Sequence, residues 1–201
     1  IMEGGVLMAI DLLPQDIRDN YEVFEWNYAT SILHCDFHQE FDEIVSILRN
    51  FRLRKEDILA NGGRKSPIAE AIDSQFYNLS WEEKWFNVNI DVDGNSVLIP
   101  THGVDCFKNS VAVEVEWNNK DPFFDRDLNN FRLLFDLNVI SVGVIITRCT
   151  SLQKIFKRLG KGSSYGTSTT HMNKLLPRIE SNGAGGCPVL VFGISENLYE
   201  E

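Results

Sequence analysis

Long apolar runs and paired cysteines are both missing from this 201-residue sequence. No stretch is apolar for the roughly 20 residues that a membrane-spanning helix needs, so no membrane partner is expected. The four cysteines are scattered and form no CxxC pair, which argues against a disulfide framework or a zinc site and favours a reducing cytoplasm. The first ten residues, IMEGGVLMAI, lack the positive flank and cleavage site of a secretory signal peptide.

Basic residues are also few, since 19 Lys and Arg face 29 Asp and Glu, and the net charge is -10. That balance speaks against a nucleic-acid partner, because phosphate binding needs Lys and Arg. It does not exclude one, because a basic cleft can occur on an acidic protein and metal-binding carboxylates add negative charge themselves. With 43% hydrophobic residues, the chain can bury one substantial core, so we expect a single domain over residues 1–201.

The part of the chain up to about residue 85 is expected to be mainly helical. Within residues 36–51 the apolar side chains recur at the spacing of an amphipathic helix. Residues 66–79 begin with Ser66 and Pro67, which suit the N-cap and first position of another helix. A shorter helical turn, closed by glycines, is expected at residues 54–63.

Residues 86–195 alternate between strand and helix patterns and are expected to form a sheet core. Strands separated by helices imply crossover connections, so we predict an α/β fold with a mixed sheet. Strands are expected at residues 85–92 with a turn at 93–96, and at 110–117, 139–148 and 187–194. Helices are expected at residues 121–138, 151–159 and 171–179, the last ending near Pro177.

Three carboxylates lie in the segment VDCFKNSVAVEVEW, residues 104–117. Glu114 and Glu116 are two positions apart in a run of valines, so they lie on the same face of the expected strand. Two like charges on a half-buried strand are costly unless a cation lies between them, and a divalent metal ion would supply one. If the preceding segment pairs with this strand as a hairpin, Asp105 joins them at one end of the sheet. The alternative is that the acids are solvated residues on an exposed strand face.

The same segment resembles the PD-(D/E)XK nuclease motif, and more narrowly the type II restriction endonucleases of the BglII and BstYI kind, with BamHI a more distant relative. The family's metal-binding hairpin has an Asp, eight residues, and then Glu-x-Gln or Glu-x-Glu. The resemblance covers about residues 64–195 and implies a restriction-endonuclease-like mixed β-sheet flanked by helices. Further stretches are similar in family order: KSPIAEAIDSQFYNLSWEEKW, SVGVIITRCTSLQKIF, GSSYGTSTTHMNKLLPRI and GGCPVLVFGI.

Carried over onto this chain, the resemblance implies Asp105, Glu114 and Glu116 as catalytic residues. Asp105 and Glu114 would be ligands of Mg²⁺, with the carbonyl of Val115 as a third. Glu116 stands where many relatives have Lys, where BglII-like enzymes have Gln and where BamHI-like enzymes have Glu. A carboxylate there can accept a proton from the attacking water or ligate the metal. Glu70 and Glu83 are candidates for one more acid, although for both the sequence favours a position on a surface helix.

The resemblance also implies DNA contacts just after the acids and in the loop of residues 160–170. Asn119 lies three residues after Glu116, where relatives have a base-contacting side chain, and Asn can contact adenine through two hydrogen bonds. An Asn-Asn pair is also ordinary turn material, and a Ser- and Thr-rich loop is often only a connection. The candidate DNA-binding residues are Asn118, Asn119, Lys120, Arg148, Ser163, Ser164 and Tyr165.

Two groups of basic residues could hold DNA phosphates, although each member taken singly is more often a solvated surface charge. His34 and His38 have the spacing of two metal ligands on one helix face, but no third ligand follows at a recognisable spacing, which favours a structural role. The basic groups are Arg148, Lys154, Lys157, Arg158 and Lys161, and Arg52, Arg54, Lys55, Arg64 and Lys65.

The predicted function is therefore that of a homodimeric, Mg²⁺-dependent type II endonuclease. It would cut double-stranded DNA at a short palindrome and so restrict foreign DNA in a prokaryotic cytoplasm. A symmetric cut needs two active sites related by a two-fold axis, which a homodimer supplies. The alternatives are a structure-specific or repair nuclease of the same superfamily, and a DNA-binding module of this fold that does not cut. The intact set of acids argues against the second.

Overall fold

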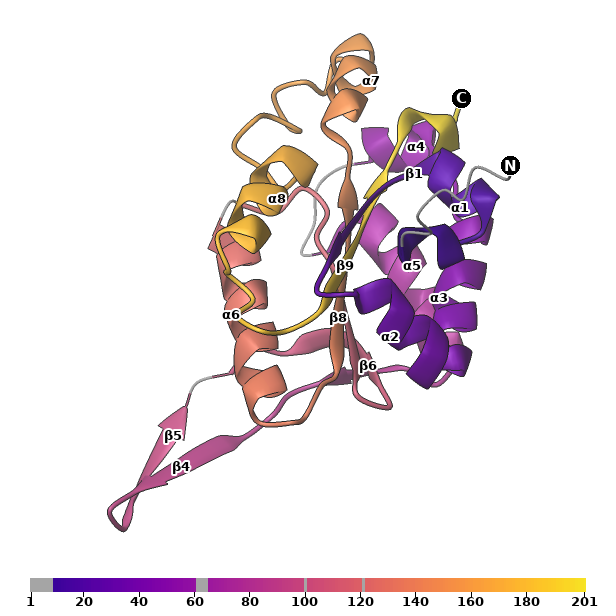
Figure 1. Cartoon of the computed structure of the whole chain (residues 1–201). Coiled ribbons are helices and arrows are strands. Elements are labelled where there is room, and N and C mark those ends of the chain that lie inside the picture. Colours follow the sequence, from indigo (N-terminus) through magenta and orange to yellow (C-terminus); the bar gives the residue numbers. More distant parts are fainter. Residues whose placement is uncertain (1–8, 61–64, 100, 121) are drawn as a thin grey trace, which may run out of the picture.

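A six-stranded mixed sheet forms the middle layer of the molecule (Figure 1). The computed structural model describes residues 9–60, 65–99, 101–120 and 122–201. The strand order is β1-β9-β8-β7-β6-β3; β7, β8 and β9 are parallel to one another, and the other neighbours are antiparallel. The strands are β1 (Tyr21–Trp26), β3 (Glu82–Lys84), β6 (Val104–Lys108), β7 (Val111–Val115), β8 (Val142–Arg148) and β9 (Val189–Ile194).

Helices cover both faces of this sheet, as the predicted α/β fold requires (Figure 1). One face carries α1 (Gln15–Asn20), α2 (Ala29–Asp36), α3 (His38–Asn50) and α5 (Pro67–Asn78), and the other carries α6 (Pro122–Asp136) and α8 (Met172–Glu180). The smaller elements are α4 (Lys55–Leu59), α7 (Gln153–Arg158) and the parallel pair β2 (Leu53–Arg54) and β10 (Tyr199–Glu200).

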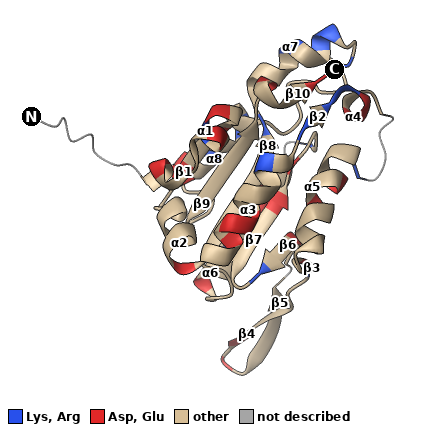
Figure 2. Cartoon of the chain, turned by 90° about the vertical axis from the view of Figure 1, so that its right-hand side faces the viewer, with Lys and Arg blue, Asp and Glu red and all other residues tan. Residues whose placement is uncertain are grey.

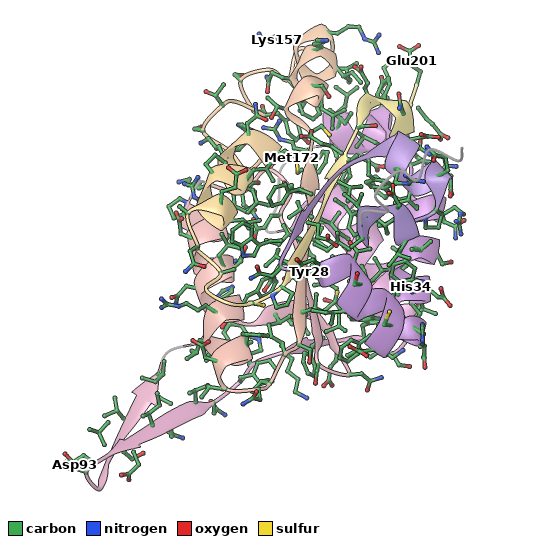
Figure 3. All side chains as sticks on the ribbon, viewed as in Figure 1. Tyr28, His34, Asp93, Lys157, Met172 and Glu201 are labelled. Carbon is green, nitrogen blue, oxygen red and sulfur yellow. The ribbon has the colours of Figure 1, made fainter. Side chains whose placement is uncertain are left out.

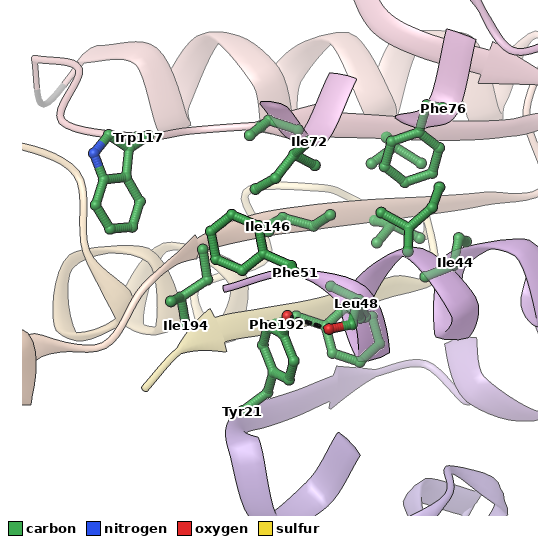
Figure 4. Packing of buried hydrophobic residues seen from close by; sticks show 14 of the residues in the cluster. Tyr21, Ile44, Leu48, Phe51, Ile72, Phe76, Trp117, Ile146, Phe192 and Ile194 are labelled. Carbon is green, nitrogen blue, oxygen red and sulfur yellow. Dashed lines mark hydrogen bonds between the residues drawn. The ribbon is translucent and has the colours of Figure 1, made fainter. Parts of the chain in front are cut away.

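The central strands supply two separate apolar cores because their side chains alternate between the two faces. In β7, Val111 and Val113 join the core under α3 and α5, whereas Ala112 joins the core under α6. Figure 4 shows part of the first core, in which the Tyr21 hydroxyl donates to the Leu48 carbonyl at 2.8 Å. On the opposite face Met172 of α8 packs against the sheet (Figure 3).

Most of the expected elements are present, and Ser66 caps α5 by accepting the N–H of Ala69 at 3.1 Å. Two differences stand out. The helical N-terminal part also contains β1, which pairs with β9 at the edge of the sheet. Helix α8 continues past Pro177 to Glu180, because its buried side chains extend to Ile179. The glycines expected to close the helical turn at residues 54–63 lie outside the described residues. Residues 1–8, which belong to the segment compared with a signal peptide, lie outside them as well.

The predicted strand and turn at residues 85–96 form a separate hairpin of β4 (Val88–Val92) and β5 (Asn95–Ile99). This hairpin projects from the body of the molecule, with Asp93 at its tip (Figure 3). It leads directly into β6 and therefore into the segment that carries Asp105. Within the described residues, no helix has the length and apolar character needed to span a membrane.

Candidate active site

The acids of residues 104–116 lie on a β-hairpin whose tight turn sets their register. Strands β6 and β7 are antiparallel with Cys106 opposite Val113, and the turn residues Asn109 and Ser110 have φ values of 45° and 67°. Two consecutive left-handed residues are the geometry of a two-residue hairpin turn. Asp105 and Glu114 lie one position farther along each strand, so the predicted hairpin is confirmed and brings these two acids together.

Backbone donors of the hairpin hold both carboxylates. The Asp105 N–H donates to Glu114 Oε2 at 3.3 Å, and the Val115 N–H donates to Asp105 Oδ2 at 3.0 Å. From α5, the Tyr77 hydroxyl donates to the Asp105 carbonyl at 3.2 Å. The two side chains are therefore positioned by the sheet itself, which is more rigid than a loop.

Glu114 is buried in a way that leaves half of its carboxylate unsatisfied. Glu114 is 1% exposed, and its Oε1 has no hydrogen-bond partner in the described part of the chain. Burial, followed by the charges of Asp127, Asp105 and Glu116, raises the pKa of Glu114 well above 4.5. Because Glu116 is also 1% exposed, the alternative of solvated acids on an open strand face is wrong.

Glu116, just beyond the end of β7, contacts α6 and the segment after the strand. Its Oε2 accepts a hydrogen bond from Asn119 Nδ2 at 2.6 Å, and its Oε1 lies 3.4 Å from Arg126 Nη2. Burial and the neighbouring Asp127 raise the pKa of Glu116 to about 9, and burial raises that of Asp127 to about 6. The buried surroundings of Glu116 and the acid beside it therefore favour its protonated form in the absence of a cation.

Asp127 is the residue of this site that sequence reasoning missed. It is 0% exposed on α6, and Arg126 Nη2 donates to its Oδ1 at 2.9 Å. The signal was present in the spacing, because Asp127 falls within the buried stripe formed by Phe124, Leu128 and Phe131. An acid at a core position of an amphipathic helix is costly unless it has a partner, and so marks a polar site.

A cleft of about 720 Å³ opens beside the acids. Asp105 and Val115 line it, together with His102, Asn118 and Asn119. Of the two candidates for a further acid, Glu83 lines this cleft, whereas Glu70 is an exposed residue of α5 that does not. The geometry therefore favours Glu83 over Glu70.

The residues present fit a hard divalent ion. In the described ranges, no three or more His, Cys, Asp or Glu side chains gather in an arrangement that could hold a metal. Asp105 and Glu114 are neighbours, however, since the Asp105 N–H donates to Glu114 Oε2 and the charge of Asp105 raises the pKa of Glu114. The Oε1 of Glu114 has no hydrogen-bond partner among the described residues, so it could serve as an oxygen ligand. Mg²⁺ is usually bound through one or two carboxylates, with waters and substrate phosphate completing its shell. The set of Asp105, Glu114 and the Val115 carbonyl meets that requirement.

The predicted DNA-reading residues fall into an accessible group and a buried one. Lys120, Ser163 and Ser164 are exposed, and Asn118 and Asn119 line the cleft. Asn119 also bonds to Glu116, so one residue links the cleft to the acids. Tyr165 lines the cleft as well, although it is only 7% exposed. Its ring stacks on Phe156 with centroids 4.2 Å apart, and this stacking fixes the loop.

Arg148 is a correction to the predicted phosphate-binding surface. It is 1% exposed, and its Nη2 donates to Thr169 Oγ1 at 2.9 Å and to the carbonyls of Tyr165 and Gly166. Its guanidinium therefore supports the loop from inside and is not free for DNA. Three other members of its group, Lys154, Lys157 and Arg158, lie exposed on α7 at one end of the molecule (Figure 2), and the fourth, Lys161, is half-buried in the loop after α7. Arg64, of the second basic group, lies outside the described residues.

The His34 and His38 pair does not have the helical geometry that its spacing suggested. Helix α2 ends at Asp36 and α3 begins at His38, so the two residues belong to different helices. Their rings meet edge to face with centroids 5.7 Å apart. This contact is a packing interaction between helix ends, in keeping with the structural role that the sequence favoured.

Comparison with known proteins agrees with this architecture. A family model described as restriction endonuclease BglII/BglIII matches residues 21–194, from the start of β1 to the end of β9. A search of curated proteins found no match. Because the family match spans all six strands of the sheet and the acid-bearing hairpin, the chain belongs to the BglII/BglIII family of restriction endonucleases.

Proposed function

We propose that this protein is a Mg²⁺-dependent type II endonuclease that cuts double-stranded DNA at a short palindromic site. One observation carries the proposal: a buried carboxylate with an unpartnered oxygen, Glu114, meets Asp105 at the wall of an open cleft. A non-cutting module has no need to bury unsatisfied acids beside a cleft, because that arrangement costs stability.

In this proposal Asp105, Glu114 and the Val115 carbonyl hold Mg²⁺, which when bound stabilises charge on the phosphate and lowers the pKa of a bound water. The sheet contributes position, since backbone hydrogen bonds hold both carboxylates. The cleft contributes room for a DNA strand to reach them. Glu83, on the cleft wall, is the proposed further acid.

Glu116 is the proposed proton acceptor for the attacking water. Burial and the neighbouring Asp127 raise the pKa of Glu116 above that of an ordinary carboxylate, which favours uptake of a proton at this position. Asn119 and Arg126 hold its two oxygens, so the proton would be received at a fixed place. Binding of a cation to Glu114 would favour loss of the Glu116 proton beforehand, which would leave Glu116 free to act as a base.

Asn118, Asn119, Lys120, Ser163, Ser164 and Tyr165 are the residues that we propose contact DNA. The Lys120 backbone bridges to Thr169, and the Thr170 N–H donates to the Asn119 carbonyl at 2.9 Å. These bonds join the segment after β7 to the loop of residues 160–170. We expect the two segments to approach DNA as one surface.

The test is digestion of a long sequenced duplex DNA with the purified protein in Mg²⁺, Ca²⁺ and EDTA. We expect discrete fragments with Mg²⁺ only. Glu114→Ala should lower the cutting rate by roughly a hundredfold or more, because it removes a ligand of the metal that activates the water. Glu180→Ala is the matched control, since Glu180 is an exposed acid of α8 outside the cleft.

The products separate the candidate functions. Fragments with one common end sequence support the restriction endonuclease. Smears or cuts confined to branched DNA would instead favour a repair nuclease of the same superfamily. If the folded protein binds DNA and cuts neither methylated nor unmethylated duplexes, the proposal is refuted in favour of a binding module.

A further inference from the structure

Lys65, just before α5, lies on the wall of the cleft that holds Asp105. Its side chain is 42% exposed, so the ammonium group is accessible to a ligand in the cleft. Among the described residues that line this cleft, Lys65 is the only Lys or Arg. Asp57, Glu83 and Asp105 line the same cleft, so its wall carries more negative charge than positive.

Two contacts fix the position of this ammonium group. Lys65 forms an ion pair with Asp73, which is 1% exposed on α5. The Lys65 Nζ also lies 5.7 Å from the centre of the Tyr77 ring, and the Tyr77 hydroxyl donates to the Asp105 carbonyl. Lys65 is therefore tied through α5 to the strand that carries Asp105.

Asp73 is buried more deeply than a simple surface ion pair requires. Cys106, the neighbour of Asp105 on β6, donates its Sγ–H to Asp73 Oδ1 at 3.8 Å. Burial is the largest single influence and lowers the pKa of Lys65, but the bond to Asp73 and the charges of Asp73, Tyr77 and Asp105 together raise the pKa above its ordinary value. The lysine is thus a permanent cation at neutral pH.

A cleft of this charge is a poor binding site for a polyanion. DNA phosphates gain affinity from Lys and Arg that replace their counterions, and acids without bound metal repel them. Glu116 cannot supply positive charge, and Arg126 is already paired with Glu116 and Asp127. A cation beside Asp105 would attract a phosphate to the acids whether or not metal is bound.

We propose that Lys65 binds the phosphate that is to be cleaved, by donating a hydrogen bond to a non-bridging oxygen, and that Asp73 is the positioning residue that aims it. This inference rests on the proposed nuclease function and adds a substrate-binding residue to it. The competing reading is that Lys65 only neutralises the buried charge of Asp73. The two readings differ in what the removal of Lys65 does to DNA binding.

The experiment measures the affinity of a short fluorescent duplex DNA over a range of NaCl concentrations, in EDTA and again in Ca²⁺. We expect Lys65→Met to reduce the slope of log K against log [salt] by about 1, since one phosphate contact is lost. Lys65→Arg should keep the slope because it keeps the charge. Lys65→Gln should show the same reduction of the salt slope as Lys65→Met. Because its amide can still bond to Asp73, it serves as a second variant in case Lys65→Met misfolds.

Lys84→Met is the matched control. Lys84 is also paired with a carboxylate, that of Glu82, and its side chain is 38% exposed, but it does not line the cleft. Its substitution should leave the salt slope unchanged. Asp73→Asn keeps the charge of Lys65 but removes the ion pair that positions its ammonium group. The affinity for DNA and the salt slope should therefore stay unchanged. The single-turnover cutting rate should then fall about tenfold or more.

An unchanged slope in a folded Lys65→Gln or Lys65→Met protein would overturn the inference and leave Lys65 as the counterion of Asp73. An equal reduction of the salt slope in Lys84→Met would overturn the inference too, because the effect would then come from net charge alone. If the wild-type protein binds DNA but cuts nothing in Mg²⁺, the proposed function fails while the slopes still decide the role of Lys65. If the wild type binds no DNA in either condition, both proposals fail.

Discussion

At the scale of single residues, the site holds buried carboxylates whose charged forms are destabilised by their surroundings. Glu114, Glu116 and Asp127 are all buried, and burial is the main cause that raises the pKa of each. Neighbouring acids raise the pKa of Glu114 and Glu116 further, whereas the bonds of Asp127 to Glu116 and Arg126 offset part of its rise. Carboxylates with raised pKa bind more protons in the folded protein than in the unfolded chain. The free energy of unfolding must therefore fall as the pH rises from the ordinary pKa of these acids to their raised pKa in the folded protein.

We predict that the melting temperature of the protein in EDTA decreases from about pH 4.5, the ordinary value for Glu, towards about pH 9, the pKa of Glu116. Adding Mg²⁺ or Ca²⁺ should raise the melting temperature more at pH 8 than at pH 6, because the ion competes with protons for the same carboxylates. A pH series of thermal unfolding curves, with and without metal, measures both effects.

Glu116→Gln is the informative variant in that series. It removes the ionisable group while keeping a side chain of the same shape, so the decline of stability with pH should become shallower. Glu180→Ala should leave the decline as it is, since Glu180 is an exposed acid. A metal-free protein that becomes more stable between pH 5 and pH 8 would contradict the burial of these acids.

At the scale of elements, helix α6 connects the second core to the site. Phe131 of α6 packs directly on Gly143 of β8, where an added Cβ would come within 2.4 Å of the ring. The preceding turn of the same helix carries Arg126 and Asp127 to Glu116. The close approach at Gly143 therefore helps to set the distance between α6 and the acids.

We predict that Gly143→Ala lowers the free energy of unfolding by about 1–3 kcal/mol, because the extra methyl group overpacks a core without free space. Urea unfolding measures this change. The cutting rate should fall as well, since moving α6 displaces Asp127 from Glu116. Gly186→Ala is the control, because its Cβ would lie at an ordinary 3.4 Å from Phe135. Equal stabilities of the two variants would show that α6 is not closely seated on β8.

At the scale of the whole molecule, the described residues form one acid-bearing hairpin beside the cleft, whereas a palindromic cut in duplex DNA needs two active sites. The family match shows membership of a restriction endonuclease family, and the homodimer stays a prediction that the palindromic cut implies. The charge of -10 makes a second copy repulsive at long range, so the association should be stronger in moderate salt than in very low salt.

We predict that sedimentation of the protein with duplex DNA carrying its site gives a complex whose mass is that of the duplex plus two chains of 22.9 kDa each. Wild-type protein mixed with an excess of Glu114→Ala protein should then convert a circular plasmid that carries the site into nicked circles. The reason is that a mixed dimer has only one active site that can cut. Full-length double-strand cuts that persist in proportion to the wild-type protein would instead show that one chain acts alone.

Much of the fold could be predicted from local pattern. The amphipathic spacing of residues 36–51, the Ser66 cap and the valine-rich strands each depend on neighbours within a few residues, and all are present. The family resemblance pointed to the hairpin of Asp105 and Glu114, and its Asn-Ser turn is itself a local feature. Local sequence also contained a signal for β1, because its YEVFEW segment is rich in the aromatic and β-branched residues that favour strands, but its pairing with residues 189–194 is not local.

What the sequence alone determined is the order of the elements and the placing of two acids across one hairpin. Only the tertiary structure decided the rest of the site: Asp127 beside Glu116, Arg148 turned into the loop, and Lys65 held on the cleft wall by Asp73. The physical reason is that local pattern depends on backbone periodicity, which neighbouring residues set. Burial and charge environment depend on which distant elements pack together, and the same residue type can face water or another helix.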